Sequence, residues 1–135
     1  KKVVSYTAKI RLYRNLSKRD LGGKTRMKEI DDILKKLIEF RDNRDWKQFH
    51  TPENLAKSIS IEASELLENY QWGNEHADIE NIKEEVADIF GYLLLLCKEL
   101  EIDLLDVTNK KIELNREKYP VDKAFGTSKK YNKLD

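Results

Sequence analysis

The sequence predicts an all-α protein built from four helices, and three observations support this class. Apolar residues recur every three or four positions over four separate stretches, the spacing of amphipathic helices. The chain has 5 Gly and 2 Pro among 135 residues, too few for the many turns of a β-sandwich. With 39% apolar and 38% charged residues, it can bury a core beneath solvated helix faces. Short connections between the four stretches predict a four-helix bundle.

The first two helices are expected over residues 28–42 and 52–70. In the first, apolar residues recur at helical spacing from Ile30 to Ile38. The second has a clear start signal, because Thr51 is a favoured N-cap and Pro52 suits the first helical position. The polar residues between these two helices predict a break in the chain.

The third and fourth helices are expected over residues 78–101 and 103–119. An apolar stripe runs along the third from Ile82 to Leu100, after a loop that contains Gly73. Asp103 is a candidate N-cap for the fourth helix, and Pro120 ends it because proline cannot continue a helix. The domain is therefore expected over residues 27–120, followed by a basic tail over residues 121–135.

Residues 1–26 differ from the rest in both charge and pattern. They contain nine basic side chains and one acid, a net charge of +8, whereas residues 27–135 carry −7. Polar and apolar residues alternate from Val4 to Leu12, which predicts a strand, and Gly22-Gly23 is expected to form a hinge. Two interpretations remain open for this segment: a basic arm for an acidic partner or nucleic acid, or an extension ahead of a start at Met27.

Two further features indicate the compartment. The longest apolar run, residues 89–97, is far shorter than the roughly 20 residues that span a bilayer. Cys97 is the single cysteine, which excludes an internal disulfide and suits a reducing compartment. A cytoplasmic protein without membrane contact is expected.

The most informative residues are four carboxylates beside apolar stripes. Glu62 and Glu65 lie on one face of the second helix, and Glu85 and Asp88 on one face of the third, each pair separated by three positions. An ionised carboxylate near a core is costly unless it is paired or binds a metal. Mg²⁺ prefers oxygen ligands, so the pattern predicts a magnesium site between the helices, with Mn²⁺ as a substitute. The alternative is that both pairs mark solvated faces of charge-rich helices.

Aromatic and basic residues could complete a nucleotide site. Trp46 and Trp72 flank the second helix and could stack on a base, or could instead cover the core. Basic residues of the fourth helix, including Lys111 and Arg116, could neutralise phosphates or be ordinary surface charge. His50 is expected to be a hydrogen-bonding loop residue.

The chain resembles the MazG-like all-α nucleoside triphosphate pyrophosphohydrolases, in particular the dCTP pyrophosphatase-type branch. The resemblance covers residues 27–134. It rests on these segments: FRDNRDWKQFH over 40–50, Pro52-x-Asn54-Leu55, IEASELLE over 61–68, Gln71-Trp72, EEVADIFGY over 84–92, and KIELNREKYP over 111–120.

The resemblance implies a role for each matched position. The four acids would hold Mg²⁺, and the two tryptophans would shape the base pocket. Tyr92, Lys111 and Asn115 would contact the substrate. It also implies a homodimer or homotetramer with the pocket near a subunit interface.

The expected activity is Mg²⁺-dependent hydrolysis of a nucleoside triphosphate, preferentially a deoxynucleotide, to the monophosphate and pyrophosphate, as nucleotide-pool house-cleaning. Water would attack the α-phosphorus in line, with Glu65 as the candidate base. Lys111 and Arg116 would meet the triphosphate. Two alternatives remain: a non-enzymatic helical module that binds nucleic acid through residues 1–26, and a metal-stabilised scaffold without turnover. Nucleic acid is not an expected partner of the enzyme.

Overall fold

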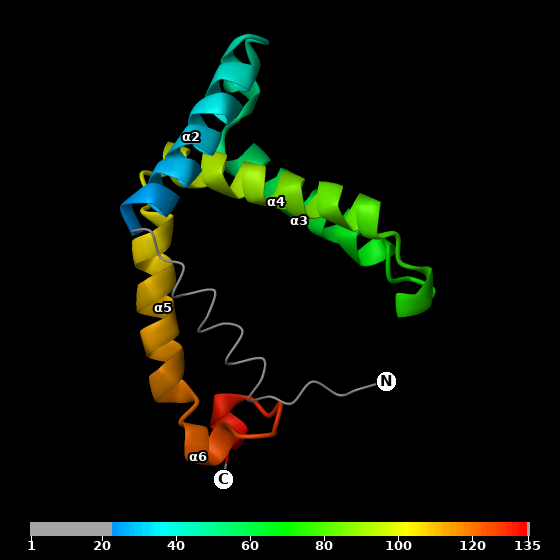
Figure 1. Cartoon of the computed structure of the whole chain (residues 1–135), viewed down its shortest axis with the longest axis vertical. Coiled ribbons are helices and arrows are strands. Elements are labelled where there is room, and N and C mark those ends of the chain that lie inside the picture. Colours follow the sequence, from blue (N-terminus) through cyan, green and yellow to red (C-terminus); the bar gives the residue numbers. More distant parts are fainter. Residues whose placement is uncertain (1–22, 135) are drawn as a thin grey trace. The chain divides into compact units, whose positions relative to one another are not determined.

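A computed structural model describes residues 23–134, and every regular element in this part of the chain is helical. The all-α class is therefore confirmed for the described residues (Figure 1). The α-helices are α2 (Gly23–Asp42), α3 (Pro52–Glu68), α4 (Ile79–Glu99), α5 (Leu104–Lys118) and the short α6 (Val121–Ala124). Three 3₁₀ turns, η1 (Trp46–Phe49), η2 (Asn74–His76) and η3 (Tyr131–Lys133), lie between or after them. The strand predicted over residues 4–12 lies outside the described residues.

The chain divides into two compact units at Arg44, and the first contains α2. This helix begins at Gly23 rather than near Met27, so Gly23 is helical and not part of a hinge. At its far end, the Arg44 guanidinium lies 3.6 Å from the centre of the Phe40 ring and donates to the Phe40 carbonyl at 2.9 Å. This stacking and hydrogen bond occupy one of the carbonyl groups that a helix end leaves without an intrahelical partner.

In the second unit, α3 begins at its predicted cap. The Thr51 side chain accepts a hydrogen bond from the Asn54 backbone N–H at 3.2 Å, with Pro52 at the first helical position. The Asn54 side chain donates to the Phe49 carbonyl at 2.9 Å and ties η1 to the helix. α3 ends two residues before the predicted limit. After it, Gly73 adopts a φ of 106°, a backbone conformation that residues other than glycine rarely adopt.

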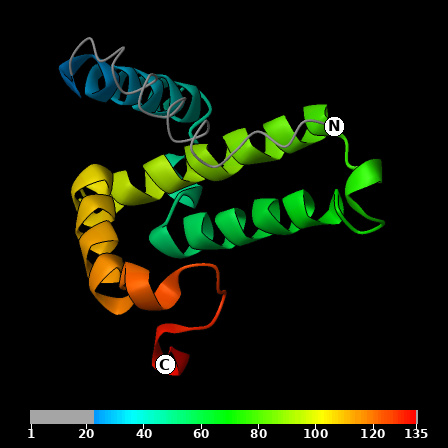
Figure 2. The same ribbon diagram turned by 60° about the horizontal axis from the view of Figure 1, so that its bottom comes forward.

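α3 and α4 form an antiparallel hairpin and are the closely packed pair of this unit (Figure 2). Their core includes Leu55, Leu94 and Leu95, each at most 4% exposed, together with Cys97. Asp78 caps α4 by accepting from the Glu80 N–H at 2.9 Å. This interface fixes the relative position of the side chains that face it from the two helices.

α5 differs from the predicted bundle helix. Its start is as expected, because Asp103 accepts from the Asp106 N–H at 3.0 Å. However, no residue of α5 is buried, and it packs along neither α3 nor α4. The predicted four-helix bundle is thus not formed within the second unit, which contains three of the four predicted helices. In a single chain, α5 leaves the hairpin at the end of α4 (Figure 1).

The basic tail has structure of its own. The Tyr131 ring packs edge-on against Tyr119 with a 6.0 Å centroid separation, and the Lys118 ammonium lies 5.2 Å from the Tyr131 ring centre. These contacts fold the tail back on the end of α5. Among the helices described, none has the length and apolar character to cross a bilayer.

Candidate active site

The α3–α4 hairpin brings together three of the four carboxylates predicted to bind metal. One oxygen from each of Glu62, Glu65 and Glu85 lies within 4.8 Å of the others. Asp88, one turn before Tyr92 on α4, is close enough to Glu62 to affect its ionisation. Glu85 is 8% exposed, whereas Glu65 and Asp88 face solvent. The site therefore has a buried side and an open side.

The neighbouring carboxylates affect the ionisation of Glu62. Burial raises the pKa of Glu62, and the neighbouring charges of Glu65, Asp88 and Glu85 raise it further. A bound cation would offset the repulsion that raises this pKa.

The donor set fits a hard divalent cation. All donors are carboxylate oxygens, the ligand type that Mg²⁺ and Mn²⁺ prefer. Opposite ligands of one octahedral Mg²⁺ are about 4.2 Å apart, and the three oxygens found here spread over at most 4.8 Å. Small side-chain rotations would therefore suffice to place three ligands around one ion.

Tyr92 lies next to this group. Burial raises the pKa of its phenol, as do the charges of Glu62 and Asp88, whereas the Ser58 hydroxyl lowers it. The His50 ring lies edge-on to Tyr92, with a centroid separation of 6.4 Å and an interplanar angle of 65°. The structure thus adds Ser58 and His50 to the surroundings of the site. Sequence reasoning assigned His50 only to a loop and overlooked Ser58, although Ser58 lies one turn before Glu62.

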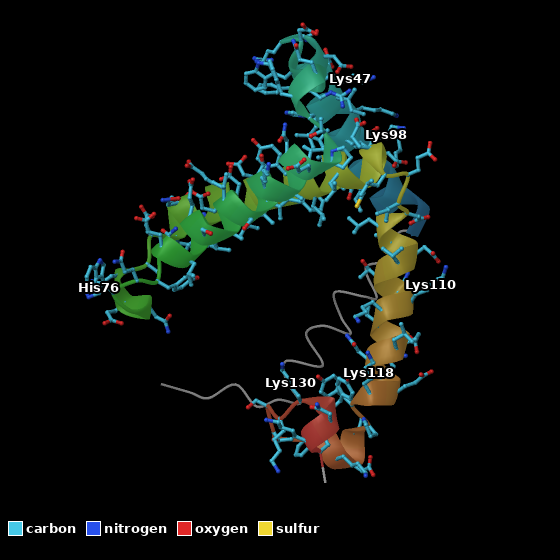
Figure 3. The ribbon with its side chains drawn as sticks, turned by 180° about the vertical axis from the view of Figure 1, so that it is seen from behind. Lys47, His76, Lys98, Lys110, Lys118 and Lys130 are labelled. Atoms are coloured by element: carbon cyan, nitrogen blue, oxygen red, sulfur yellow. The ribbon has the colours of Figure 1, made fainter. Side chains whose placement is uncertain are left out.

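The two tryptophans are not brought together within one chain. Trp46 is in η1, before α3, and Trp72 is in the loop after it. The 17 residues of α3 separate these positions by about 25 Å. Figure 3 shows the same separation through Lys47, next to Trp46, and His76, in the loop that follows Trp72. Trp72 is 75% exposed, so the expectation of a common base pocket fails for a single chain.

The predicted phosphate-binding residues of α5 also lie apart from the carboxylates. Lys111 and Asn115 are exposed, on a helix that packs along neither α3 nor α4. The Arg116 guanidinium donates to both oxygens of Glu113, at 2.9 and 3.1 Å. Lys110, labelled in Figure 3, pairs with Asp106 at 2.7 Å. A single chain therefore presents the acidic half of the predicted site without its basic half.

Similarity to known proteins shows the family of the chain. The family model described as the MazG-like family matches residues 57–134, a range that includes all four carboxylates and the tail. The chain is 33% identical over 114 residues to dCTP pyrophosphatase 1 of Homo sapiens, covering 78% of this chain and 67% of that protein. The corresponding protein of Bos taurus is also 33% identical, with 68% of its length covered. A crystal structure of a pyrophosphatase from Archaeoglobus fulgidus superposes with a TM-score of 0.62 at 45% identity, covering 70% of this chain and 93% of that one. The chain belongs to the MazG-like family.

Proposed function

We propose that this MazG-like nucleoside triphosphate pyrophosphohydrolase acts on a deoxynucleoside triphosphate in the presence of Mg²⁺, with dCTP as the first substrate to test. The products would be the nucleoside monophosphate and pyrophosphate. The single observation that carries the proposal is the convergence of the Glu62, Glu65 and Glu85 oxygens within 4.8 Å in a chain of this family. The names of its dCTP pyrophosphatase relatives support the choice of base. The proposed role is nucleotide-pool house-cleaning.

The four carboxylates would hold the metal. Glu62 and Glu85 would supply oxygens from the buried side of the site, and Glu65 and Asp88 from the open side. Mg²⁺, when bound there, withdraws charge from phosphate oxygens and favours attack at phosphorus. Mn²⁺ has similar ligand preferences and is expected to substitute.

Glu65 is the best-placed candidate for the base that accepts a proton from the attacking water. It belongs to the carboxylate group but is exposed, so a water molecule can reach it from solvent. Glu85, by contrast, is nearly inaccessible. In-line attack at the α-phosphorus would expel pyrophosphate as the leaving group.

The rest of the pocket requires residues from more than one chain. Tyr92 and Trp46 are proposed to contact the nucleotide from the same chain, and Trp72, Lys111 and Asn115 to come from a second copy. Arg116 would reach the triphosphate only by exchanging its Glu113 partner. α5 also exposes four apolar side chains to between 39% and 50%, namely Leu105, Val107, Ile112 and Leu114. Their exposure supports the proposed homodimer or homotetramer, in which another chain would cover them.

The proposal is tested by pyrophosphate release over a panel of canonical and modified nucleotides, with Mg²⁺ or with a chelator. Loss of a metal ligand should reduce activity more than loss of a residue that only orients a metal ligand. Glu62→Gln is therefore expected to reduce kcat/KM by at least about a hundred-fold. Glu84→Gln is the matched control, because Glu84 is exposed on α4 next to Glu85 but outside the carboxylate group. Normal pyrophosphate release by Glu62→Gln would reject the metal assignment.

A further inference from the structure

α4 carries an exposed apolar stripe on a different side of the helix from the proposed metal ligands. Ile79, Val86 and Phe90 are 60%, 51% and 37% exposed, respectively. At 100° per residue, these three positions lie within about 40° of one another around the helix axis. Glu85 lies about 100° from Val86, and Asp88 about 160°. The stripe is therefore separate from the carboxylate site.

Two half-buried residues extend this stripe, and its spacing is symmetric. Ile82 and Leu93 lie about 40° and 20° from Val86 around the axis and are partly exposed. From Ile79 to Leu93, the intervals between successive apolar positions of the stripe are 3, 4, 4 and 3 residues. This order is the same in both directions, with Val86 at its centre. A regular coiled-coil seam alternates intervals of 3 and 4 and has no such centre.

A stripe with this symmetry matches an antiparallel copy of itself. In an interface between two identical chains related by a two-fold axis, residue i contacts residue j of the other chain, and residue j contacts residue i. With the axis at Val86, Ile79 would meet the partner's Leu93, and Ile82 would meet the partner's Phe90. Val86 would meet its own counterpart. Each of these contacts joins two apolar side chains.

The charges of the hairpin also favour a second copy at this position. Residues 52–99 carry 11 acidic and 3 basic side chains, a net charge of −8, so two hairpins would repel each other over most of their surface. None of the five stripe positions is charged. Lys83, which borders the stripe, is paired with Glu80 at 2.7 Å. Two copies can thus meet along the stripe without placing carboxylates opposite each other.

We propose that α4 of one chain packs antiparallel against α4 of a second copy along this stripe, with the two-fold axis at Val86. This contact rests on the homo-oligomer included in the proposed function, and it assigns a surface to that oligomer. Because the carboxylates lie on another side of α4, the contact leaves the site of each chain open to substrate.

Cysteine cross-linking of the full chain tests the contact. A residue on a two-fold axis lies next to its own counterpart, so a single cysteine can form a disulfide there. Cys97→Ala removes the native thiol. In that background, Val86→Cys should cross-link most chains into dimers under mild oxidation, as seen on a non-reducing gel. Glu84→Cys is the matched control, because position 84 is exposed on α4 about 160° from Val86. It should cross-link at least about ten-fold more slowly.

A charge on the axis gives an independent measurement. Val86→Lys would place two ammonium groups against each other and should lower the mass of the oligomer, measured by light scattering during size-exclusion chromatography. Glu84→Lys introduces the same side chain away from the stripe and should keep the wild-type mass. Circular dichroism of both variants controls for loss of the helical fold.

The outcomes separate this contact from the proposed activity. Cross-linking of Val86→Cys that is no faster than that of Glu84→Cys would overturn the inference, whether or not the chain hydrolyses dCTP. An unchanged mass of a folded Val86→Lys variant would overturn it too, and if this variant does not fold, the cross-linking result decides. Rapid cross-linking at Val86 in a chain that releases no pyrophosphate would support the contact and reject the proposed function.

Discussion

Glu62 has the most demanding environment of the proposed metal ligands. It is partly buried in the α3–α4 interface and has three carboxylates near it. Burial and these charges together raise its pKa and favour the neutral form. The same environment would make the residue a strong ligand once a cation is present, because metal binding relieves both the burial cost and the repulsion.

This residue makes the stability of the metal-free protein depend on pH. A carboxyl whose pKa is higher in the folded than in the unfolded state stabilises the fold fully below its ordinary pKa. That contribution is lost as the pH rises through the raised pKa. In the presence of a chelator, the melting temperature of the wild type should therefore fall relative to that of Glu62→Gln as the pH rises over this interval. Thermal melts across pH measure it, and adding Mg²⁺ at neutral pH should restore wild-type stability while helping Glu62→Gln less. A difference between the two proteins that does not vary with pH would contradict the assigned environment of Glu62.

The α3–α4 hairpin is the element that places the site residues. Its caps at Thr51 and Asp78 fix where each helix starts, and its apolar layer at Leu55 and Leu95 fixes the register between the helices. As a result, Glu62 and Glu65 of α3 lie close to Glu85 of α4. The site is thus a consequence of how the hairpin packs.

A substitution at Leu55 tests whether the hairpin depends on the packing of its apolar layer. At 1% exposed it is the most completely buried large side chain among the described residues. Leu55→Ala is expected to reduce the free energy of unfolding by about 2–5 kcal/mol, from lost burial and the cavity that remains. Urea denaturation measures the change, and Leu67→Ala, at a position 70% exposed in the same helix, is the control. Equal effects of the two substitutions would show that the hairpin is not held by the layer at Leu55.

The local features of the helices were predicted well from the sequence. Thr51-Pro52 and Asp103 gave correct helix starts, because a cap depends on neighbouring residues alone. The spacing of Glu62, Glu65 and Glu85 correctly predicted their convergence, because residues three apart share a face. The position of α5 and the separation of Trp46 from Trp72 were not predictable in this way. They depend on how whole helices pack, which periodicity does not specify.

At the level of the whole molecule, the net charge and the exposed apolar surface both bear on how the chain could bind a triphosphate. Residues 27–135 carry a net charge of −7, which on its own would repel a triphosphate. The four proposed ligands account for −4 of this charge, and bound Mg²⁺ would offset much of it locally. In the proposed oligomer, a second chain would cover the exposed apolar side chains of α5 and supply the basic residues of the site.

The basic N-terminal segment should be dispensable for turnover. Because α2 begins at Gly23, the informative truncation removes residues 1–22 and leaves this helix whole. The truncated chain is expected to keep the kcat/KM of the full chain and its oligomeric state, measured by kinetics and by light scattering during size-exclusion chromatography. A loss of turnover, or salt-sensitive nucleic-acid binding that disappears with the segment, would favour the binding-module alternative.

In the proposed reaction, the α3–α4 carboxylate site directs water to the α-phosphorus of a nucleoside triphosphate. Hydrolysis of dCTP in ¹⁸O-labelled water, followed by mass spectrometry of the products, tests it most directly. We expect dCMP that carries the label and pyrophosphate that does not, with no product from Glu62→Gln. Label in the pyrophosphate, or dCDP and inorganic phosphate as products, would contradict it.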